Sequence, residues 1–100
     1  MQIIKISAIP AQSFNVVLEQ QNCTINIYQK STGLYLDLLL GKKKIITGSL
    51  CRDRVKIIKG KHKGFVGDLT FVDKEGATDP EYSKLGTRYF LAYIEKTDGI

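Results

Sequence analysis

Apolar and polar residues alternate along most of this chain, and the alternation restricts the fold more than any other feature. A period of two places successive side chains on opposite faces of an extended strand. Each run is four to eight residues long and is bounded by turn-forming residues, and no segment has a long helical period. The in-phase apolar series are Ile4 and Ile6; Phe14, Val16 and Leu18; Cys23, Ile25 and Ile27; Leu34, Leu36, Leu38 and Leu40; Leu69 and Phe71; and Tyr89, Leu91 and Tyr93.

This pattern predicts an all-β fold, a small antiparallel barrel or sandwich of about seven or eight short strands. The length of 100 residues suits one modest hydrophobic core, so residues 1–100 are expected to form a single β domain. One short helical turn is expected near residues 79–85. There Asp79 can act as N-cap, Pro80 suits the first helical position, and Gly86 can close the turn in the left-handed conformation.

Composition narrows the class of protein. Asp37 interrupts the longest leucine-rich stretch, so no run reaches the roughly 18 apolar residues of a membrane span. The two cysteines are Cys23 and Cys51, and Cys23 is in phase with the apolar positions of its strand. We expect two reduced cysteines in the core, while a disulfide between strands stays open because sequence cannot show that the two Cβ atoms meet.

The net charge of +5 is unevenly distributed. Residues 41–63 contain nine Lys or Arg and one acidic residue, whereas residues 64–100 contain four basic and seven acidic residues. Such asymmetry favours either a polyanionic partner or complementary faces that meet neighbouring subunits. The candidate basic docking edge comprises Lys42, Lys43, Lys44, Lys59, Lys61 and Lys63.

Several predicted strands also carry apolar residues on the nominally outer face, Ile3 and Ile94 among them. One interpretation is a core with two sides, and the other is a protein–protein interface, where tyrosine and phenylalanine are favoured. Both stay open from the sequence. The candidate interface residues are Val17, Tyr28, Tyr35, Leu39 and Phe90.

Residue types that carry catalysis are sparse. The one histidine, His62, lies in a lysine-rich turn without a nearby nucleophile or a third group to orient it. The acidic residues near the C-terminus lack the alternating spacing of a calcium loop, and the chain has neither a Cys/His set for zinc nor a glycine-rich phosphate loop. We therefore predict no enzyme, no cofactor and no metal site.

The stretch VKIIKGKHKGFVGDLTFVD, from Val55 to Asp73, predicts a β-hairpin with a lysine- and glycine-rich turn. The same pattern occurs in the KOW motif, a hairpin that SH3-like barrels use on RNA. Lysines in such a turn can pair with phosphates, but Phe65 is the one aromatic residue near it that could stack on a base. An RNA-binding KOW-like barrel is therefore the alternative function, with nucleic acid as the less favoured partner.

The segment GFVGDLTFVDKEGATDPEYSKLGTRYFLAYIE, from Gly64 to Glu95, together with LYLDLLLGKKKIITGSLCRD upstream, resembles the small baseplate plug family of contractile-tailed bacteriophages and prophages. The resemblance covers nearly the whole chain, beginning at ISAIPAQSFNVVL, and DPEYSKLGTRYFLAY is its most specific block. The lysine-rich turn KIIKGKHKG departs from the family pattern. The matching positions are Gly64, Phe65, Gly67, Asp68, Asp73, Asp79, Pro80, Tyr82, Leu85, Gly86, Arg88 and Tyr89.

The resemblance implies a non-enzymatic structural protein of the virion, made in the bacterial host cytoplasm and located in the tail baseplate near the hub and tube. Its implied partners are other baseplate, hub and tube proteins, with a homo-oligomer as a further expectation. The matching residues are expected to define the fold first. Phe65 and Tyr82 would anchor long loops, and Asp79 would cap the helical turn.

Overall fold

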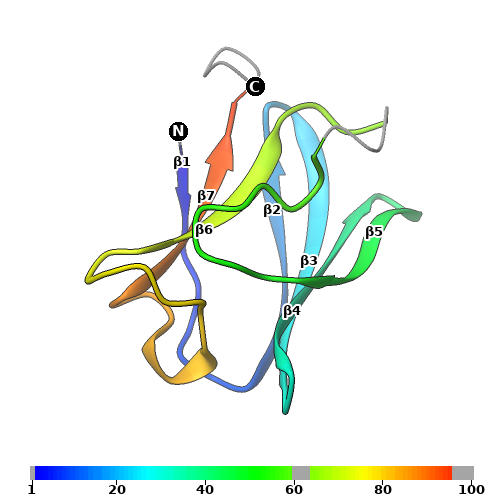
Figure 1. Ribbon diagram of the computed structural model, residues 1–100. Coiled ribbons are helices and arrows are strands. Elements are labelled where there is room, and N and C mark those ends of the chain that lie inside the picture. Colours follow the sequence, from blue (N-terminus) through cyan, green and yellow to red (C-terminus); the bar gives the residue numbers. More distant parts are fainter. Residues whose placement is uncertain (1, 60–63, 96–100) are drawn as a thin grey trace.

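The computed structural model describes residues 2–59 and 64–95, which form two antiparallel β-sheets (Figure 1). The predicted all-β class is confirmed. Within the described residues the named strands pair only inside their own sheets, and one isolated bridge, between Asp53 and Phe71, links the segment after β5 to β6. The first sheet has the order β1 (Gln2–Ile4), β7 (Tyr89–Ile94), β6 (Asp68–Asp73), and the second β2 (Ala11–Leu18), β3 (Gln21–Lys30), β4 (Gly33–Leu40), β5 (Lys43–Leu50).

The second sheet is a meander whose consecutive strands are joined by tight turns. Glu19 and Gln20 link β2 to β3 with φ angles of 47° and 65°, the conformation that two-residue hairpin turns favour because their twist matches that of the strands. The register then places Phe14 opposite Ile25 and Tyr28 opposite Tyr35. In the first sheet, β7 lies between β1 and β6, which come from opposite halves of the chain.

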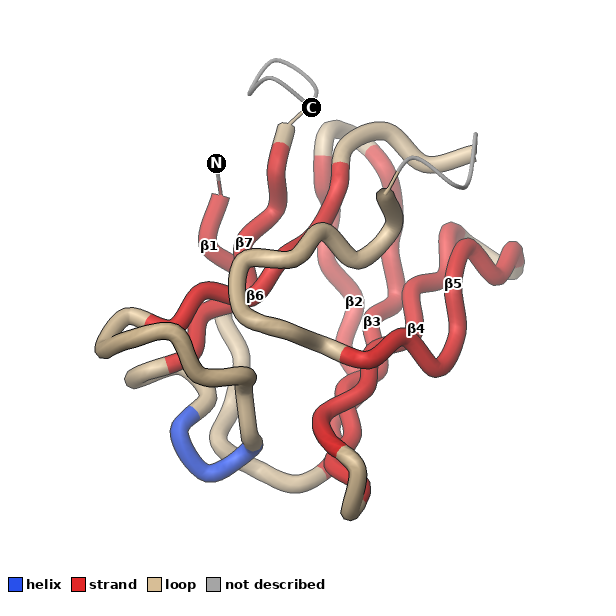
Figure 2. The backbone as a smooth tube through the Cα atoms, in the orientation of Figure 1, coloured by secondary structure: helices blue, strands red, loops and turns tan. Residues whose placement is uncertain are grey.

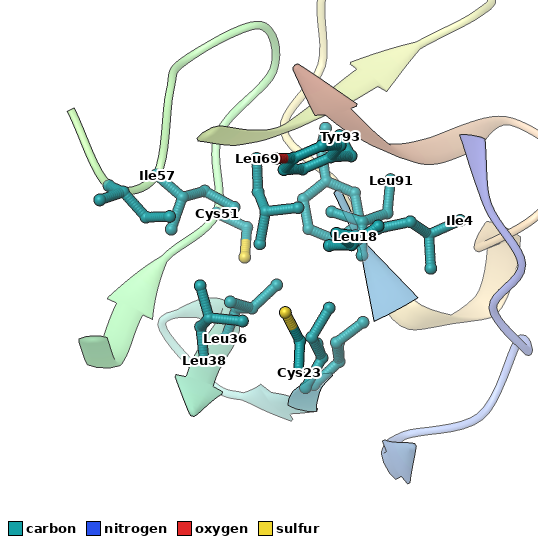
Figure 3. Close-up of a cluster of buried hydrophobic side chains, with 14 of the residues drawn as sticks. Ile4, Leu18, Cys23, Leu36, Leu38, Cys51, Ile57, Leu69, Leu91 and Tyr93 are labelled. Carbon is teal, nitrogen blue, oxygen red and sulfur yellow. The ribbon is translucent and has the colours of Figure 1, made fainter. Parts of the chain in front are cut away.

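The hydrophobic core lies between the sheets and contains most of the residues that the alternation selects, together with apolar residues from the loops. Ile25 and Leu36 of the second sheet and Leu91 of the first are fully buried, and side chains from both sheets point into one interior (Figure 3). Cys23 and Cys51 are buried free thiols in this interior, as expected. Ile94 is an exception to the pattern, because it was expected on the outer face and is buried.

The predicted hairpin of residues 55–73 is wrong in its first arm. Residues 54–58 form no strand, although they cross from β5 to lie beside β6 (Figure 2). Arg54 and Ile57 donate backbone hydrogen bonds to carbonyl oxygens of β6, at 2.7 and 2.8 Å. The physical reason is that Ile57 and Ile58 are consecutive and both buried, whereas a regular strand would place them on opposite faces.

The short helical turn is present, but its cap is not the expected one. A 3-10 turn, η1 (Tyr82–Lys84), follows Glu81 in extended conformation, without a side-chain cap hydrogen bond (Figure 2). The expectation for Asp79 is therefore corrected: its carboxylate accepts the backbone N–H of Asp53 instead, at 3.1 Å. Gly86 adopts the expected positive φ, at 85°. No helix among the described residues is long and apolar enough to cross a bilayer.

Candidate functional site

The outer face of the second sheet carries two tyrosines, on consecutive strands, that the register places side by side. Tyr28 and Tyr35 are directly opposite on β3 and β4, with stacked rings whose centroids are 6.1 Å apart. The Lys30 ammonium lies over both rings, 5.5 and 5.2 Å from their centroids, within the range of a cation–π interaction. Both rings are half-buried, so they form a partly exposed aromatic patch.

Asp37 fixes this tyrosine patch in place. Its carboxylate accepts hydrogen bonds from the Tyr28 hydroxyl at 2.9 Å and from the backbone N–H of Gly48 at 2.7 Å. Burial raises the pKa of Tyr28, and its hydrogen bond to Asp37 raises that pKa further. Burial opposes ionisation of Asp37, but these hydrogen bonds, with one from Asn26 and the charge of Lys30, together lower its pKa. The interface prediction did not include Asp37, because only the strand register shows that it meets Tyr28.

Of the other candidate interface residues, Val17 and Leu39 lie on the same sheet as the tyrosines and Phe90 lies on the other sheet. Leu39 is in phase with Tyr35 on β4 and half-buried. Val17 is 59% exposed near the end of β2. Phe90 lies on β7 in the first sheet, with the Lys74 ammonium 5.7 Å from its ring centroid. The five candidates therefore occupy both sheets, and their role in binding stays a prediction.

One residue of the candidate basic docking edge, Lys59, lines a groove that contains both apolar and cationic side chains. We call it the basic groove. It has a volume of about 500 Å³ and lies between β5 and the segment that follows it. Leu50 and Val55 in the groove are 36% and 37% exposed. All of its charged lining residues are cationic. The lining residues are Ile46, Ser49, Leu50, Arg52, Val55, Lys56, Ile57 and Lys59.

The remaining basic candidates lie around the groove or outside the described residues. Lys42, Lys43 and Lys44 are exposed at the turn into β5, on the same element as one wall of the basic groove. Lys61 and Lys63 lie outside the described residues, as does His62. Charge counting thus identified the basic region, but it could not show that Leu50 and Val55 are exposed among the cations.

Asp68 attaches the segment before the lysine-rich turn to the first sheet. Its side chain is fully buried, and its two oxygens accept the backbone N–H groups of Ile58 and Lys59, each at 2.8 Å. The same carboxylate also accepts the N–H of Leu69, at 2.7 Å. Since Lys59 lines the basic groove, Asp68 holds one wall of that groove against β6.

Asp73 and Arg88 form an ion pair in which the carboxylate is buried and the guanidinium is half-buried. The guanidinium donates to both carboxylate oxygens, at 2.8 and 2.9 Å, and the carboxylate also accepts the N–H groups of Glu75 and Thr78. The hydrogen bonds from Arg88 hold the pKa of Asp73 well below its ordinary value, and those from Asp73 raise the pKa of Arg88. This pair joins the loop after β6 to the start of β7.

Phe65 and Gly67 anchor the turn before β6. Phe65 is buried and meets Tyr93 edge to face, with ring centroids 6.0 Å apart. Gly67 has φ of 93° and lies directly against the Tyr93 ring, which leaves no space for a side chain. The Tyr93 hydroxyl donates to the carbonyl oxygen of Val66 at 2.5 Å, and burial followed by its hydrogen bond to Glu19 raises the pKa of Tyr93.

Most of the remaining family-motif residues lie in the loops around η1. Pro80, Leu85 and Tyr89 are buried, and Tyr82 is half-buried with its backbone N–H donating to the Gln29 side chain at 3.1 Å. Gly64 is half-buried. A structural role for the family-motif residues remains a prediction. Across residues 2–59 and 64–95, no group of three or more His, Cys, Asp or Glu side chains is placed to hold a metal ion.

Comparison with known protein families identifies the family of the chain. A family model described as cyanophage baseplate Pam3 plug gp18 matches residues 1–96. The match includes the basic groove, the tyrosine patch and both buried aspartates. No curated protein matches the chain.

Proposed function

The chain belongs to the family of the cyanophage baseplate Pam3 plug gp18, and on that premise we propose that it is a non-enzymatic structural component of a phage tail baseplate. In this proposal the protein is made in the bacterial host and becomes part of the virion, near the junction of hub and tube. It acts through contacts with other baseplate, hub or tube proteins. The matched family supports the baseplate role, and the surfaces of the molecule support the mode of contact.

The basic groove is the observation that carries the proposed mode of contact. Leu50 and Val55 offer apolar area to a partner, and Arg52, Lys56 and Lys59 surround that area with charge of one sign. Complementary charge at the rim of an interface sets register and speeds association, while the apolar centre supplies affinity. The fitting partner surface is therefore acidic with an apolar centre.

The tyrosine patch supplies a second contact surface beside the basic groove, since Tyr35 on β4 is paired with Leu50 on β5. Tyrosine is favoured at interfaces because a large rigid ring is buried at a small cost in side-chain entropy. Here that cost is already lowered, since stacking with Tyr35 and the hydrogen bond to Asp37 hold Tyr28 in place before binding. A homo-oligomer could use either surface, because a patch on one copy can meet a different patch on the next.

Incorporation into tail particles tests this function. Purified particles from a phage or prophage carrying the double variant Arg52→Glu and Lys56→Glu should contain at least about tenfold less of the protein than wild type, because charge reversal removes complementarity at the groove. Lys84→Glu is the matched control, since Lys84 is exposed but lies outside the groove. Quantitative mass spectrometry and the melting temperature of each variant separate lost docking from lost folding.

Two outcomes would overturn the proposal. The wild-type protein could be absent from purified particles, or its deletion could leave tails assembled and infective. RNA affinity measured at low and high salt checks the alternative function, because binding driven by phosphate contacts weakens steeply as salt rises. Strong salt-dependent RNA binding by a protein that never enters particles would favour the alternative.

A further inference from the structure

Two of the four sheet edges are protected against pairing with another strand. The β5 edge carries Lys43 and Lys44, its register with β4 shifts at two places, and Gly48 bends it with φ of 63°. Lysines and irregular pairing are common devices that prevent strand addition at an exposed edge. The β6 edge is covered by residues 54–58, which donate backbone hydrogen bonds to it.

The β2 edge has none of these protections. β2 is eight residues long, pairs with β3 alone, and contains neither a charged residue nor a proline. Its pairing with β3 is continuous from Ala11 to Leu18, without a bulge. Half of the backbone N–H and C=O groups of an edge strand point away from its neighbour. β2 therefore presents a regular row of hydrogen-bonding groups that no other described strand uses.

A groove of about 540 Å³ runs along this bare edge, and β1 forms its opposite wall; we call it the strand groove. β1 is also an edge strand, since it pairs with β7 alone. Hydrogen bonds between the Gln12 side chain and the backbone of Ser7, at 2.7 and 3.1 Å, close one end. The lining residues are Gln2, Ile3, Ile4, Lys5, Ser7, Ile9, Gln12, Ser13, Phe14, Asn15 and Val16.

The hydrophobic core is incompletely covered at the strand groove. Phe14 and Val16 point toward the core but are half-buried, whereas Ile25 and Cys23, opposite them on β3, are almost completely buried. Ile3, on β1, is exposed at the other wall. An added strand would therefore find backbone partners along β2 and apolar contacts at every second position.

We propose that the strand groove receives an extended segment of a different polypeptide, which pairs with β2 as an additional antiparallel strand. Its inward side chains are apolar and rest on Phe14 and Val16. Lys5 is the sole charged residue in the lining, so the segment is uncharged or weakly acidic. β1 forms the opposite wall of the groove, so the fitting partner is a single extended segment, whereas a second copy would bring its whole sheet. The inference that this polypeptide is a baseplate protein rests on the proposed function. The inference that the strand groove binds an extended segment does not depend on it.

A peptide probe tests the groove on the isolated protein. The probe is a fluorescent peptide of about eight residues, matching β2, that alternates valine with threonine; its control has the same sequence with every second backbone amide methylated. Anisotropy should show at least about tenfold weaker binding of the methylated peptide, because it loses backbone hydrogen bonds but keeps its side chains. Equal binding of the two peptides, or binding of neither, would refute strand addition.

Two neighbouring residues of β2 provide matched variants. Val16→Lys places a charge in the strand groove, and Val17→Lys places the same charge on the opposite face of the same strand. We expect Val16→Lys to weaken peptide binding by about tenfold or more. Val17→Lys should weaken it less, because a lysine on either face of an edge strand discourages pairing, but only Val16→Lys also displaces the apolar side chains of the peptide. Hydrogen exchange of wild-type β2 amides with and without peptide gives a readout that does not depend on either variant folding. Unchanged exchange contradicts the proposal.

Tail particles distinguish failure of the groove from failure of the proposed function. If the protein is present in particles and its β2 amides exchange more slowly there than in the free chain, the proposal is supported. Slow hydrogen exchange together with cross-links from β2 to β2 of a second copy would show that the added strand comes from this protein and not from a different polypeptide. Unchanged exchange would overturn strand addition in the assembly. Absence of the protein from particles would contradict the proposed function alone. The peptide experiment would still test whether the strand groove accepts an added strand.

Discussion

Replacing Asp68 by asparagine removes one of the two oxygens that hold the segment before the lysine-rich turn against β6. One oxygen accepts the N–H groups of Ile58 and Leu69, and the other accepts that of Lys59. An asparagine amide nitrogen cannot accept a hydrogen bond, so in either orientation of the amide at least one backbone N–H faces another donor. The side chain is 0% exposed, so water cannot take the place of the lost acceptor.

The magnitude follows from the hydrogen bonds that are lost. A hydrogen bond to a charged group contributes about 1.5–3 kcal/mol, and an unsatisfied buried donor costs about 1–3 kcal/mol. We expect Asp68→Asn to lower the free energy of unfolding by about 3 kcal/mol, a large part of the roughly 5–15 kcal/mol of an ordinary domain. With a urea slope of about 1 kcal/mol per molar for a chain of this size, the midpoint should fall by about 2–3 M.

Urea unfolding followed by circular dichroism measures this effect, since the chain contains no tryptophan to report by fluorescence. Asp79→Asn is the matched control: Asp79 is exposed and accepts a single backbone N–H, that of Asp53, at 3.1 Å. It should lose less than about 1 kcal/mol. If Asp68→Asn costs no more than the control, its hydrogen bonds do not hold residues 58 and 59 to the sheet, and the reasoning fails.

Three further predictions follow from buried groups. Because Arg88 lowers the pKa of Asp73, the pair stabilises the fold above the unfolded pKa of about 4 and loses this contribution as pH falls. The free energy of unfolding should therefore fall less steeply with decreasing pH in Asp73→Asn than in the wild type. Burial raises the pKa of Cys51 to about 12, so its thiol should react with Ellman's reagent at pH 8 only when urea unfolds the chain; rapid reaction of the native protein would contradict its burial. Gly67→Ala should lower the free energy of unfolding by more than about 2 kcal/mol, because the new methyl group meets the ring of Tyr93. Gly41 also has a positive φ but has open space around it, so Gly41→Ala should cost about 1 kcal/mol in the same thermal or urea unfolding experiment.

The faces of the strands could be predicted from the sequence because strand periodicity is a local property. Cys23, Ile25 and Ile27 are all buried on β3, and Leu34 and Leu36 are buried on β4. The side-chain period of two depends only on the extended backbone, so it needs no knowledge of the partner strand. The same reasoning failed at residues 55–58, where contact with β6 replaces a regular strand. The capping preference that predicted Asp79 as an N-cap failed because its carboxylate accepts a hydrogen bond from a residue 26 positions away.

The sequence by itself thus determined the fold class, the inward faces, the uneven distribution of charge and the resemblance to a baseplate plug family. Only the tertiary structure decided which residues of neighbouring segments meet: Tyr28 with Tyr35, Asp37 with Gly48, and Asp68 with Ile58. It also decided which sheet edges are covered and which stay bare beside the strand groove. The physical reason is that periodicity and charge are properties of the local sequence. Register, loop packing and edge exposure depend instead on contacts between different segments of the chain.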